Sequence, residues 1–256
     1  MFFYLCRRIN QFSVSLGVVR TNCQIYNDAT LVAYYPFDTT GTFNDYSVNL
    51  FNGVGINTIA LSAGRINQAI YFPSNTSYFQ AQCFTTVRLQ YQAFSISLWV
   101  NPANATGGGS LIHISTLQGG NGSICYDLLA FTSTGALVLQ WLQSGSTVNA
   151  SLGGIISANK WTHLTVVYGT VNGIRLFINN QLSTESLNYN SLSLQDATVP
   201  IYVTLGTNSP TGLAISSVCA SGSVPYLAGQ FIGGVDEFRL YNRELNNEEI
   251  CRLADM

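Results

Sequence analysis

"GGVDEFRLYNRELNNEEI", residues 233–250, has the alternation of apolar and polar residues that is typical of a β-strand, followed by the start signals of a helix. With a period of two residues, Asp236 falls on the same, inward face as Phe238 and Leu240. The intervening residues are expected to stay solvated on the opposite face: Glu237 and Arg239. Burying an acid is costly unless it is paired, hydrogen-bonded or bound to a cation. The strand therefore predicts a specific partner for Asp236.

The end of the same stretch predicts a short surface helix. Asn246 can cap the segment "NEEICRL", and Glu249 lies three residues later, where its side chain can reach back to form a capping box. The two glutamates of the first turn also favour the helix dipole. Structure alone explains these features, so the helix needs no functional role.

Short β-strands separated by Gly, Ser and Asn clusters account for most of the preceding chain. Strands are expected over 31–38, 93–102, 111–115, 127–132, 136–142 and 201–207, with a hairpin over 161–181. In the hairpin, the Asn172-Gly173 pair suits a tight turn that needs positive φ. Because no long amphipathic helix accompanies these strands, the pattern predicts an all-β protein, an antiparallel two-sheet sandwich or jelly roll.

The composition narrows the class of protein. Charged residues make up 9% of the 256 residues, against roughly 25% in an average soluble domain, and the net charge is −2. Lys160 is the only lysine, so the sequence offers a nucleic-acid backbone no basic run to bind. Apolar runs stay well under the roughly 20 residues that a membrane span needs. We therefore expect an extracellular β-protein with no nucleic-acid partner and no membrane span.

Residues 1–28 stand apart from the strand pattern. The segment "MFFYLCRRINQFSVSLGVVRTNC" (1–23) has an arginine pair and then a modest apolar stretch that Ser and Gly interrupt, as in a poor signal peptide. The alternative is that the chain is a fragment of a longer protein. We treat 1–28 as a leader or linker and expect one domain over 29–255.

Four segments, in order, carry a family resemblance: "LVAYYPFD…DYSVNLFNG" (31–53), "SISLWVNP" (95–102), "WTHLTVVY…NGIRLFINNQ" (161–181) and the opening stretch. The ordered set resembles a concanavalin A-like, laminin G-like jelly-roll domain and covers about residues 29–255. The resemblance implies two curved antiparallel sheets packed face to face, usually in extracellular, adhesive or carbohydrate-binding proteins. Because such folds host lectins, protein-binding modules and glycosidases, function has to be argued from the site.

The sequence argues against catalysis. Glucanases of this fold share a Glu-x-Asp-x-Glu strand motif, and a retaining glycosidase needs two carboxylates roughly 5 Å apart. No segment matches that motif; the glutamates are Glu185, Glu237, Glu244, Glu248 and Glu249. The two histidines, His113 and His163, are too few for a typical catalytic zinc site. We therefore expect a non-enzymatic protein, with a glycoside hydrolase that lacks the usual motif as the enzymatic alternative.

Two binding functions stay open. A glycan-binding module presents aromatic rings to sugar rings and amides to their hydroxyls, and Trp141, Tyr126 and Trp99 are conceivable platforms. Trp99 lies in a strand shared by the resembling folds, which favours a packing role. A protein-interaction or adhesion module of a larger extracellular protein would instead contact another chain through its rim loops. We favour glycan binding and keep protein binding as the alternative.

The resemblance also implies one structural calcium ion. In the family its ligands come from an early Asp-x-Ser-Gly-Asn-like loop and from the Asp of the late Val-Asp-Glu strand. Here the loop reads "DYSVN" (45–49), with valine in place of glycine. Asp45, Asn49 and Asp236 are the expected ligands, and Asp38 is a weaker candidate. The alternative is that Asp236 accepts hydrogen bonds from backbone amides of a neighbouring loop.

The six cysteines lack Cys-x-x-Cys spacing, which disfavours a zinc or redox site, and they allow 15 pairings. Jelly rolls of this family usually bring their chain ends together, which implies one bridge, and a second would tie the 208–229 segment to the body: Cys23–Cys251 and Cys125–Cys219. Two cysteines stay unassigned: Cys6 and Cys83. Six free thiols in a cytosolic protein are the alternative.

Four Asn-x-Ser/Thr sequons permit glycosylation if the protein is secreted: Asn75, Asn104, Asn121 and Asn149. A chain this rich in Asn, Ser and Thr would contain about four by chance, so the sequons are not evidence of secretion. Asn104 and Asn121 lie in Gly/Ser-rich loops and are the first sites expected to be modified.

Overall fold

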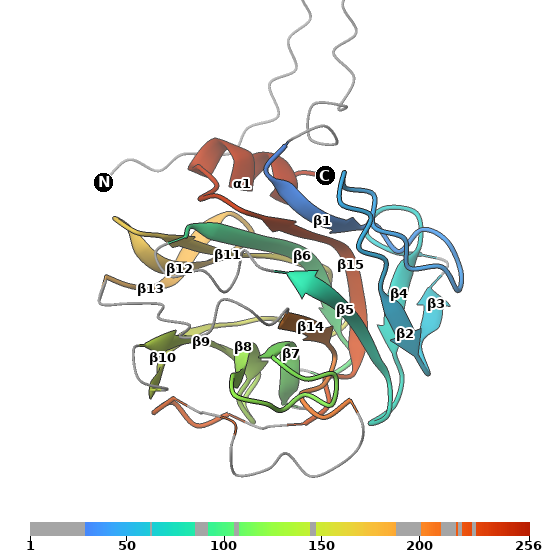
Figure 1. The fold of residues 1–256 in the computed structure, drawn as a ribbon, viewed down its shortest axis with the longest axis horizontal. Helices are drawn as coiled ribbons and strands as arrows, with labels where there is room; N and C mark the ends of the chain where they lie inside the picture. Colours follow the sequence, from blue (N-terminus) through green and yellow to red (C-terminus); the bar gives the residue numbers. More distant parts are fainter. Residues whose placement is uncertain are drawn as a thin grey trace, which may run out of the picture.

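The computed structural model describes residues 29–61, 63–84, 92–104, 108–143, 147–187, 201–210, 219, 222–226 and 229–256. The expected leader or linker, residues 1–28, lies outside these residues, and with it Cys6 and Cys23. In the described part, two antiparallel sheets pack face to face and a short helix lies near the end of the chain (Figure 1). The predicted fold, an all-β two-sheet jelly-roll sandwich, is confirmed.

Sheet A contains eight strands within the described residues: β1 (Leu31–Tyr35), β3 (Ile59–Leu61), β4 (Ala69–Phe72), β6 (Phe94–Pro102), β11 (Thr162–Gly169), β12 (Gly173–Ile178), β13 (Gln181–Ser186) and β15 (Gly233–Tyr241). Their order across the sheet is β13-β12-β11-β6-β15-β4-β3, and β1 pairs with β15. The first and last strands are therefore neighbours, as expected. The predicted hairpin turns at Gly173, where φ is 67°.

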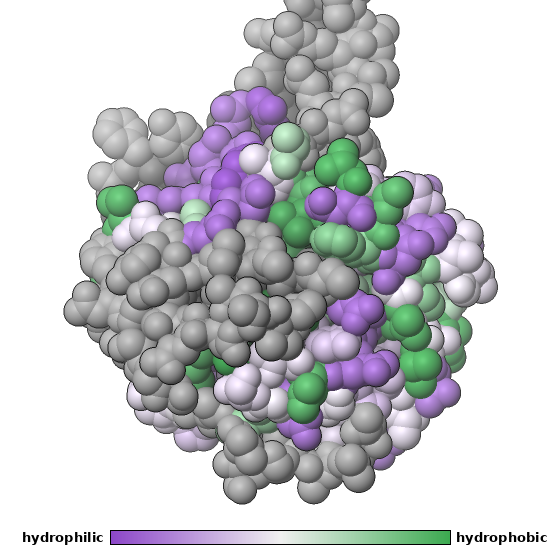
Figure 2. All heavy atoms as spheres, viewed as in Figure 1, coloured by the Kyte–Doolittle hydropathy of each residue, from purple (hydrophilic) through white to green (hydrophobic). Residues whose placement is uncertain are grey.

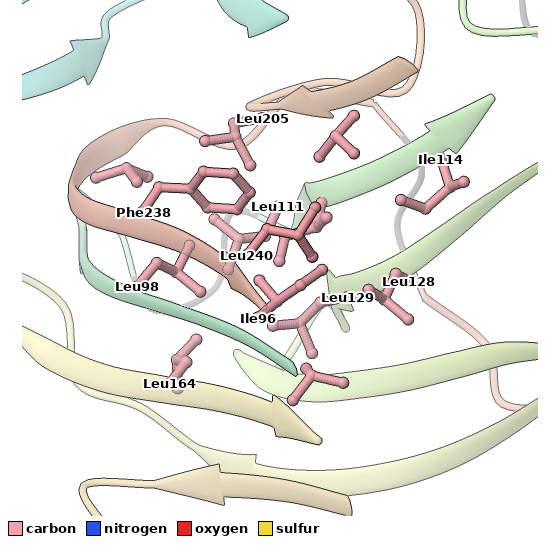
Figure 3. Packing of buried hydrophobic residues seen from close by; sticks show 14 of the residues in the cluster. Ile96, Leu98, Leu111, Ile114, Leu128, Leu129, Leu164, Leu205, Phe238 and Leu240 are labelled. Atoms are coloured by element: carbon pink, nitrogen blue, oxygen red, sulfur yellow. The ribbon is translucent and has the colours of Figure 1, made fainter. Parts of the chain in front are cut away.

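Sheet B contains seven strands within the described residues: β2 (Val54–Ile56), β5 (Tyr78–Phe84), β7 (Gly109–Ser115), β8 (Cys125–Phe131), β9 (Ala136–Gln143), β10 (Thr147–Ile155) and β14 (Ile201–Leu205). Their order is β10-β9-β8-β7-β14-β5-β2. A continuous apolar core fills the space between the sheets, and Ile96, Leu98 and Val100 of β6 face it as their alternation predicts. Figure 3 shows side chains of both sheets meeting in this core, among them Leu98, Leu111 and Leu129.

Strand β15 departs from the simple period-two pattern at Glu237, where φ is 55°. Asp236 pairs with Trp99 of β6, but the next pair along the two strands is Arg239 with Ser97, so β15 carries one extra residue. An extra residue in one strand is a β-bulge, and it changes which residues share a face.

The bulge overturns the predicted faces of the strand. The core-facing residues of β15 are Val235, Phe238 and Leu240. Asp236 instead lies opposite Trp99 on the outer face of sheet A, because directly paired residues project to the same side. The prediction that Glu237 and Arg239 stay solvated is also wrong: each is 1% exposed, and they form an ion pair with each other.

Helix α1 (Asn247–Ala254) covers part of the outer face of sheet A. Asn246 Oδ1 accepts a hydrogen bond from the Glu249 amide at 3.0 Å, and the Glu249 carboxylate accepts one from the Asn246 amide at 2.9 Å. The predicted capping box is therefore confirmed. Ile250 and Leu253 pack into an apolar cluster that includes Leu31 of β1, which ties the helix to the first strand. Among the described residues, no helix is both long enough and apolar enough to cross a membrane.

Candidate functional site

A cavity of about 250 Å³ opens at the edge of the sandwich where sheet A ends in β3 and sheet B ends in β2. Both edge strands are only three residues long, so they leave this side of the sandwich partly open. The residues that line the cavity, which we call the edge pocket, are Phe37, Thr39, Thr40, Gly41, Phe43, Gly55, Asn57, Thr58, Ile59, Ala60, Ala69 and Ile70.

Neutral polar groups contribute to the wall of the edge pocket. Asn57 adopts a left-handed conformation with φ of 50°, and its Nδ2 donates to Thr76 Oγ1 at 3.0 Å, which leaves its Oδ1 as an acceptor. The Thr58 hydroxyl lies beside Gly55, because a Cβ at position 55 would stand 2.9 Å from Thr58 Oγ1. Asn57 and Thr58 therefore supply an amide and a hydroxyl among the residues that line the pocket.

Aromatic rings form the apolar part of the wall. The half-buried ring of Phe43 packs against Phe37, with centroids 6.3 Å apart, and against Phe79 at 5.7 Å. Gly55 is required beside this ring, since a Cβ there would come within 2.3 Å of Phe43. An apolar wall with a few fixed polar groups is the usual chemistry of a small-molecule site.

Six exposed apolar side chains lie between residues 46 and 59, in the segment that runs into the pocket lining, and we call them the apolar rim: Tyr46, Val48, Leu50, Val54, Ile56 and Ile59. Val48 and Leu50 are 70% and 69% exposed. Figure 2 shows separate groups of hydrophobic residues, with hydrophilic residues between them, on the side of the molecule where Figure 1 places β2 and β3. Several neighbouring exposed apolar residues on one surface indicate a contact surface more than chance scatter does.

Asp45, a predicted calcium ligand, is buried and organises the loop that carries part of the apolar rim. Its Oδ1 accepts hydrogen bonds from the amides of Tyr34 and Ser47, both at 2.8 Å. Its Oδ2 accepts from the Ser47 hydroxyl at 2.7 Å and from the Phe51 amide at 2.9 Å. Asn49, the second predicted ligand, donates its Nδ2 to a backbone carbonyl of β1 at 2.9 Å. Both residues therefore hold the loop through hydrogen bonds.

Asp236, the third predicted ligand, is anchored to a different loop. Its Oδ2 accepts from the Ile66 amide at 2.9 Å and its Oδ1 from the Glu237 amide at 2.8 Å. Burial raises the pKa of Asp236 to about 8, with the charge of Glu237 adding to the rise and the hydrogen bond from Ile66 opposing it. Backbone amides are thus the partners that the structure gives this acid.

The described part of the chain contains no preformed cluster of side chains that would hold a calcium ion. There, no group of three or more His, Cys, Asp or Glu side chains converges as metal ligands would. The weaker candidate Asp38 accepts hydrogen bonds from the Gln68 amide and from Asn67 Nδ2, both at 3.2 Å. The donors around these carboxylates are mostly N–H groups, which do not coordinate a cation. A calcium site formed by Asp45, Asn49 and Asp236 stays a prediction.

A second polar cluster lies buried on the outer face of sheet B. His113 Nδ1 is 2.8 Å from Asp127 Oδ1, and His113 Nε2 is 2.7 Å from the Gly120 carbonyl. Asn208 Nδ2 donates to Asp127 Oδ2 at 3.0 Å. His113 and Asp127 are each 1% exposed, so the loop of Gly120 and the segment after β14 cover them. This cluster fastens loops to the sheet and offers no open site.

Asp127 makes the fold sensitive to acid. Burial alone would raise the pKa of Asp127, but the hydrogen bond and charge of His113, together with hydrogen bonds from Tyr226 and Ser110, lower the pKa below the usual 3.8. A lowered folded-state pKa contributes stability that is present above the unfolded-state pKa and is lost as pH falls through the folded-state pKa. We therefore expect the unfolding free energy to fall below about pH 4.

Asp127→Asn removes the titrating carboxyl, so this variant should show a shallower loss of stability below that pH. Urea unfolding between pH 7 and pH 2.5 measures the slope, and Asp255→Asn, at an exposed position, is the matched control. Equal slopes in Asp127→Asn and the wild type would contradict the assignment.

The three conceivable sugar platforms are buried. Tyr126, Trp141 and Trp99 are 1%, 7% and 5% exposed, and the first two face the core between the sheets because of their place in the strand alternation. Trp99 packs against His163, with ring centroids 5.1 Å apart, and lies under the Arg65 guanidinium. Their use as stacking platforms is therefore wrong, whereas the packing role of Trp99 is confirmed.

His163 belongs to the same buried layer on the outer face of sheet A. Its Nε2 lies 2.9 Å from the Ser97 hydroxyl. Burial, together with the positive charges of Arg239 and Arg65, lowers the pKa of His163 to about 3. A buried, neutral histidine that bonds a neighbouring strand has a structural role.

One predicted disulfide is present: Cys125 and Cys219 are bonded, with Cα atoms 4.8 Å apart. Cys251 is also disulfide-bonded, and its predicted partner Cys23 lies outside the described residues. Of the sequon asparagines, Asn75 and Asn104 are exposed and Asn121 and Asn149 are partly buried.

Sequence reasoning missed the polar residues of the edge pocket. Thr39, Thr40, Asn57 and Thr58 lie in turns, where such residues are common for conformational reasons. The sequence feature that could have indicated Asn57 and Thr58 is their position between the short apolar segments 54–56 and 59–61 near the start of the domain.

Comparison with protein families places residues 73–251 in a laminin G-type model described as the concanavalin A-like lectin/glucanases superfamily. No curated protein sequence matches the chain. Solved structures share the fold at low sequence identity. Domain 4 of AbnA, an extracellular arabinanase of Geobacillus stearothermophilus solved with arabinotriose, has a TM-score of 0.57 and 17% identity, over 88% of this chain and 98% of that one.

Two toxin domains are similar in the same way. The binding domain of Paraclostridial Mosquitocidal Protein 1 has a TM-score of 0.62 and 18% identity, over 88% of this chain and 52% of that one. The ligand-binding domain of botulinum neurotoxin serotype D, solved with N-acetylneuraminic acid, has a TM-score of 0.56 and 12% identity, over 88% and 50%. This chain thus spans about half the length of these toxin domains.

Proposed function

Because the chain belongs to the concanavalin A-like lectin/glucanases superfamily, we propose that it is a non-catalytic extracellular module that binds glycans through the edge pocket. The observation that carries this proposal is that the Phe43 ring, the Asn57 amide and the Thr58 hydroxyl all belong to residues that line one open cavity. Sugar rings present C–H faces to aromatic rings and hydroxyls to amides and hydroxyls. Structural neighbours solved with arabinotriose and with N-acetylneuraminic acid support a sugar ligand.

Removing one pocket hydroxyl tests the site. Thr58→Val keeps the shape of the side chain but deletes its donor and acceptor, so we expect affinity for the best ligand of a glycan array to fall about tenfold. Isothermal titration calorimetry measures the change. Thr170→Val, at an exposed turn between β11 and β12, is the matched control. Unchanged affinity in Thr58→Val would place the sugar elsewhere on the protein.

The non-catalytic part of the proposal has its own test. The carboxylates of β15 and α1 have structural partners: Glu237 pairs with Arg239, Asp236 accepts hydrogen bonds from backbone amides, Glu248 pairs with Arg252 and Glu249 caps the helix. These partners support a role outside catalysis. Incubation with arabinans and β-glucans should release no reducing sugar. Hydrolysis that one acid-to-amide substitution abolishes would make the protein a glycoside hydrolase.

Protein binding is the second candidate, and the apolar rim favours it. The four hydrogen bonds to Asp45 fix the loop of Tyr46, Val48 and Leu50, so these apolar side chains are held in solvent by a rigid backbone. A preorganised apolar surface reduces the entropy lost on docking. Glycan arrays compared with pull-downs from secreted proteins separate the two functions, and loss of pull-down in Val48→Ser would assign the rim to a protein partner.

The structural calcium ion is a separate proposal, supported by the burial of Asp45 and Asp236. If calcium binds there, EDTA should lower the melting temperature of the wild type but not of Asp236→Ala. Asp236→Ala should also destabilise the protein by about 1–3 kcal/mol, because buried donors lose their acceptor. An unchanged melting temperature of the wild type in EDTA would leave the amides of Ile66 and Glu237 as the partners of Asp236.

An extracellular location is part of the proposal. The Cys125–Cys219 bridge supports an oxidising compartment, because disulfides are rare in reducing cytosol. Glycosylation is then expected first at the predicted loop sites Asn104 and Asn121, with Asn75 and Asn149 as further sites. A mass shift of the secreted protein on enzymatic deglycosylation checks this.

A further inference from the structure

We infer that the edge pocket selects neutral sugars over sialylated or other acidic ones, an inference that rests on the proposed glycan-binding function. The described residues that line the pocket are apolar or uncharged: hydroxyls, one amide, aromatic rings and backbone. A carboxylate sugar brings a full negative charge, which needs a cation or a convergent set of donors to replace its water.

Asp38, which lies beside the edge pocket, has the wrong sign of charge for an acidic sugar. Asp38 directly precedes the lining residue Thr39, and its carboxylate accepts hydrogen bonds from the Gln68 amide and Asn67 Nδ2, both at 3.2 Å. The lining residue Thr40 donates through Oγ1 to Gln68 Oε1 at 3.4 Å. Asp38 and the edge pocket therefore share Gln68 as a neighbour. A second negative charge docked here is repelled, which is how a site rejects the wrong ligand.

The neighbouring cation is directed elsewhere. The Arg65 guanidinium lies over the ring of Trp99, 4.3 Å from its centroid, and Trp99 is on the outer face of sheet A. The edge pocket opens between the sheet edges instead, so Arg65 is committed to the aromatic ring and not to a ligand carboxylate. With a net charge of −2, the chain as a whole also gives an acidic ligand no long-range attraction.

The size of the pocket limits how much of a glycan enters. Its volume of about 250 Å³ is just below the roughly 300–1,000 Å³ of drug-sized ligand sites. A cavity of this size admits about one sugar ring, and Phe43, Asn57 and Thr58 are the lining residues that would meet its C–H face and its hydroxyls. The ligand class is therefore a neutral terminal or branch sugar.

Matched glycans test this selectivity. A panel of neutral oligosaccharides, arabinotriose included, is compared by array and calorimetry with oligosaccharides capped by N-acetylneuraminic acid, each beside its uncapped parent. We expect the capped form to bind about tenfold more weakly than its parent or worse, with a smaller difference at high salt because ions screen the repulsion. Asp38→Asn should narrow the difference in affinity between the capped and uncapped glycans. Thr40→Lys should narrow it further, because it adds a cation to the lining of the edge pocket.

The outcomes separate this inference from the proposed function. Preference for the capped glycans, lost in Thr58→Val, overturns the selectivity and leaves glycan binding at the pocket standing. No binding to any glycan overturns the proposed function and the inference together. Neutral preference that both Asp38→Asn and Thr40→Lys leave unchanged shows that the charge beside the edge pocket does not determine it and overturns the inference. The Thr170→Val variant should match the wild type throughout.

Discussion

Replacing Glu237 with alanine is expected to lower the free energy of unfolding by about 3–5 kcal/mol, the usual cost of removing one partner of a buried ion pair. The side chains of Arg239 and Glu237 are 1% and 2% exposed, and the guanidinium donates through Nη2 to the carboxylate. The Tyr34 hydroxyl lies 3.0 and 3.1 Å from the two carboxylate oxygens. Alanine would leave the guanidinium buried without a counter-charge.

The arrangement around Arg239 explains why the loss is large. Burial of Arg239 would lower its pKa, because burial disfavours the charged guanidinium. The nearby Glu237 carboxylate has the opposite effect, and the net result is a raised pKa. The guanidinium also lies over the Tyr34 ring, 4.2 Å from its centroid, and donates through Nη1 to the Glu237 carbonyl at 3.3 Å. Without the carboxylate, Arg239 loses its strongest partner, and these weaker contacts offset little of its desolvation.

Two variants isolate the charge from other effects of the substitution. Glu237→Gln keeps the length of the side chain and removes only the charge, so it should lie between the wild type and Glu237→Ala in urea unfolding. The double variant Glu237→Leu with Arg239→Leu removes both charges and should cost less than Glu237→Ala alone, because no charge is left unpaired. A Glu237→Ala protein within about 0.5 kcal/mol of the wild type would mean that the pair is not buried in solution.

The bulge that creates this ion pair marks the limit of the sequence interpretation. Alternation correctly placed Phe238 and Leu240 in the core, because period two holds on each side of the bulge. The residue that absorbs the irregularity is Glu237, at φ of 55°, and glutamate carries no sequence signal for that conformation. Asp236 therefore moved to the outer face, where its partners are amides of a loop distant in sequence.

Local signals were more reliable, because their partners lie nearby in the chain. The capping box needs only Asn246 and Glu249, and the hairpin turn needs only the Asn172-Gly173 pair, so short-range spacing was enough to predict both. Pattern did not predict the short edge strands β2 and β3. Three residues are too few to show a periodicity.

The edge pocket was out of reach for a related reason. Its wall combines the 37–43 loop, the turn at Asn57 and Thr58, and the start of β4, which come together only because β3 pairs with β4 and β4 with β15. Each segment alone reads as an ordinary turn or strand. Their residue type makes Trp99 and Trp141 conceivable sugar platforms. The strand alternation that identified the fold, however, turns Trp141 inward.

Removing the Cys125–Cys219 disulfide is expected to lower the free energy of unfolding by about 2–4 kcal/mol. The bridge spans 94 residues, and closing a loop of that length restricts the unfolded chain strongly in the chain-entropy account. In the folded state it joins the start of β8 to the segment near the Asp127 cluster, where Asn208 and Gly120 meet the sheet. The substitution should therefore weaken this cluster before it weakens the core.

The paired variant Cys125→Ala with Cys219→Ala measures the effect by urea unfolding under non-reducing conditions. Adding dithiothreitol to the wild type is not equivalent, because it also reduces the bridge of Cys251. Amide hydrogen exchange should rise around Gly120 and Asn208 while the amides of β6 and β11 stay protected, since local opening has a lower free energy than global unfolding. Glycan binding at the edge pocket, which shares no residue with this cluster, should persist. Uniform loss of protection across both sheets would instead show that the bridge holds the whole sandwich together.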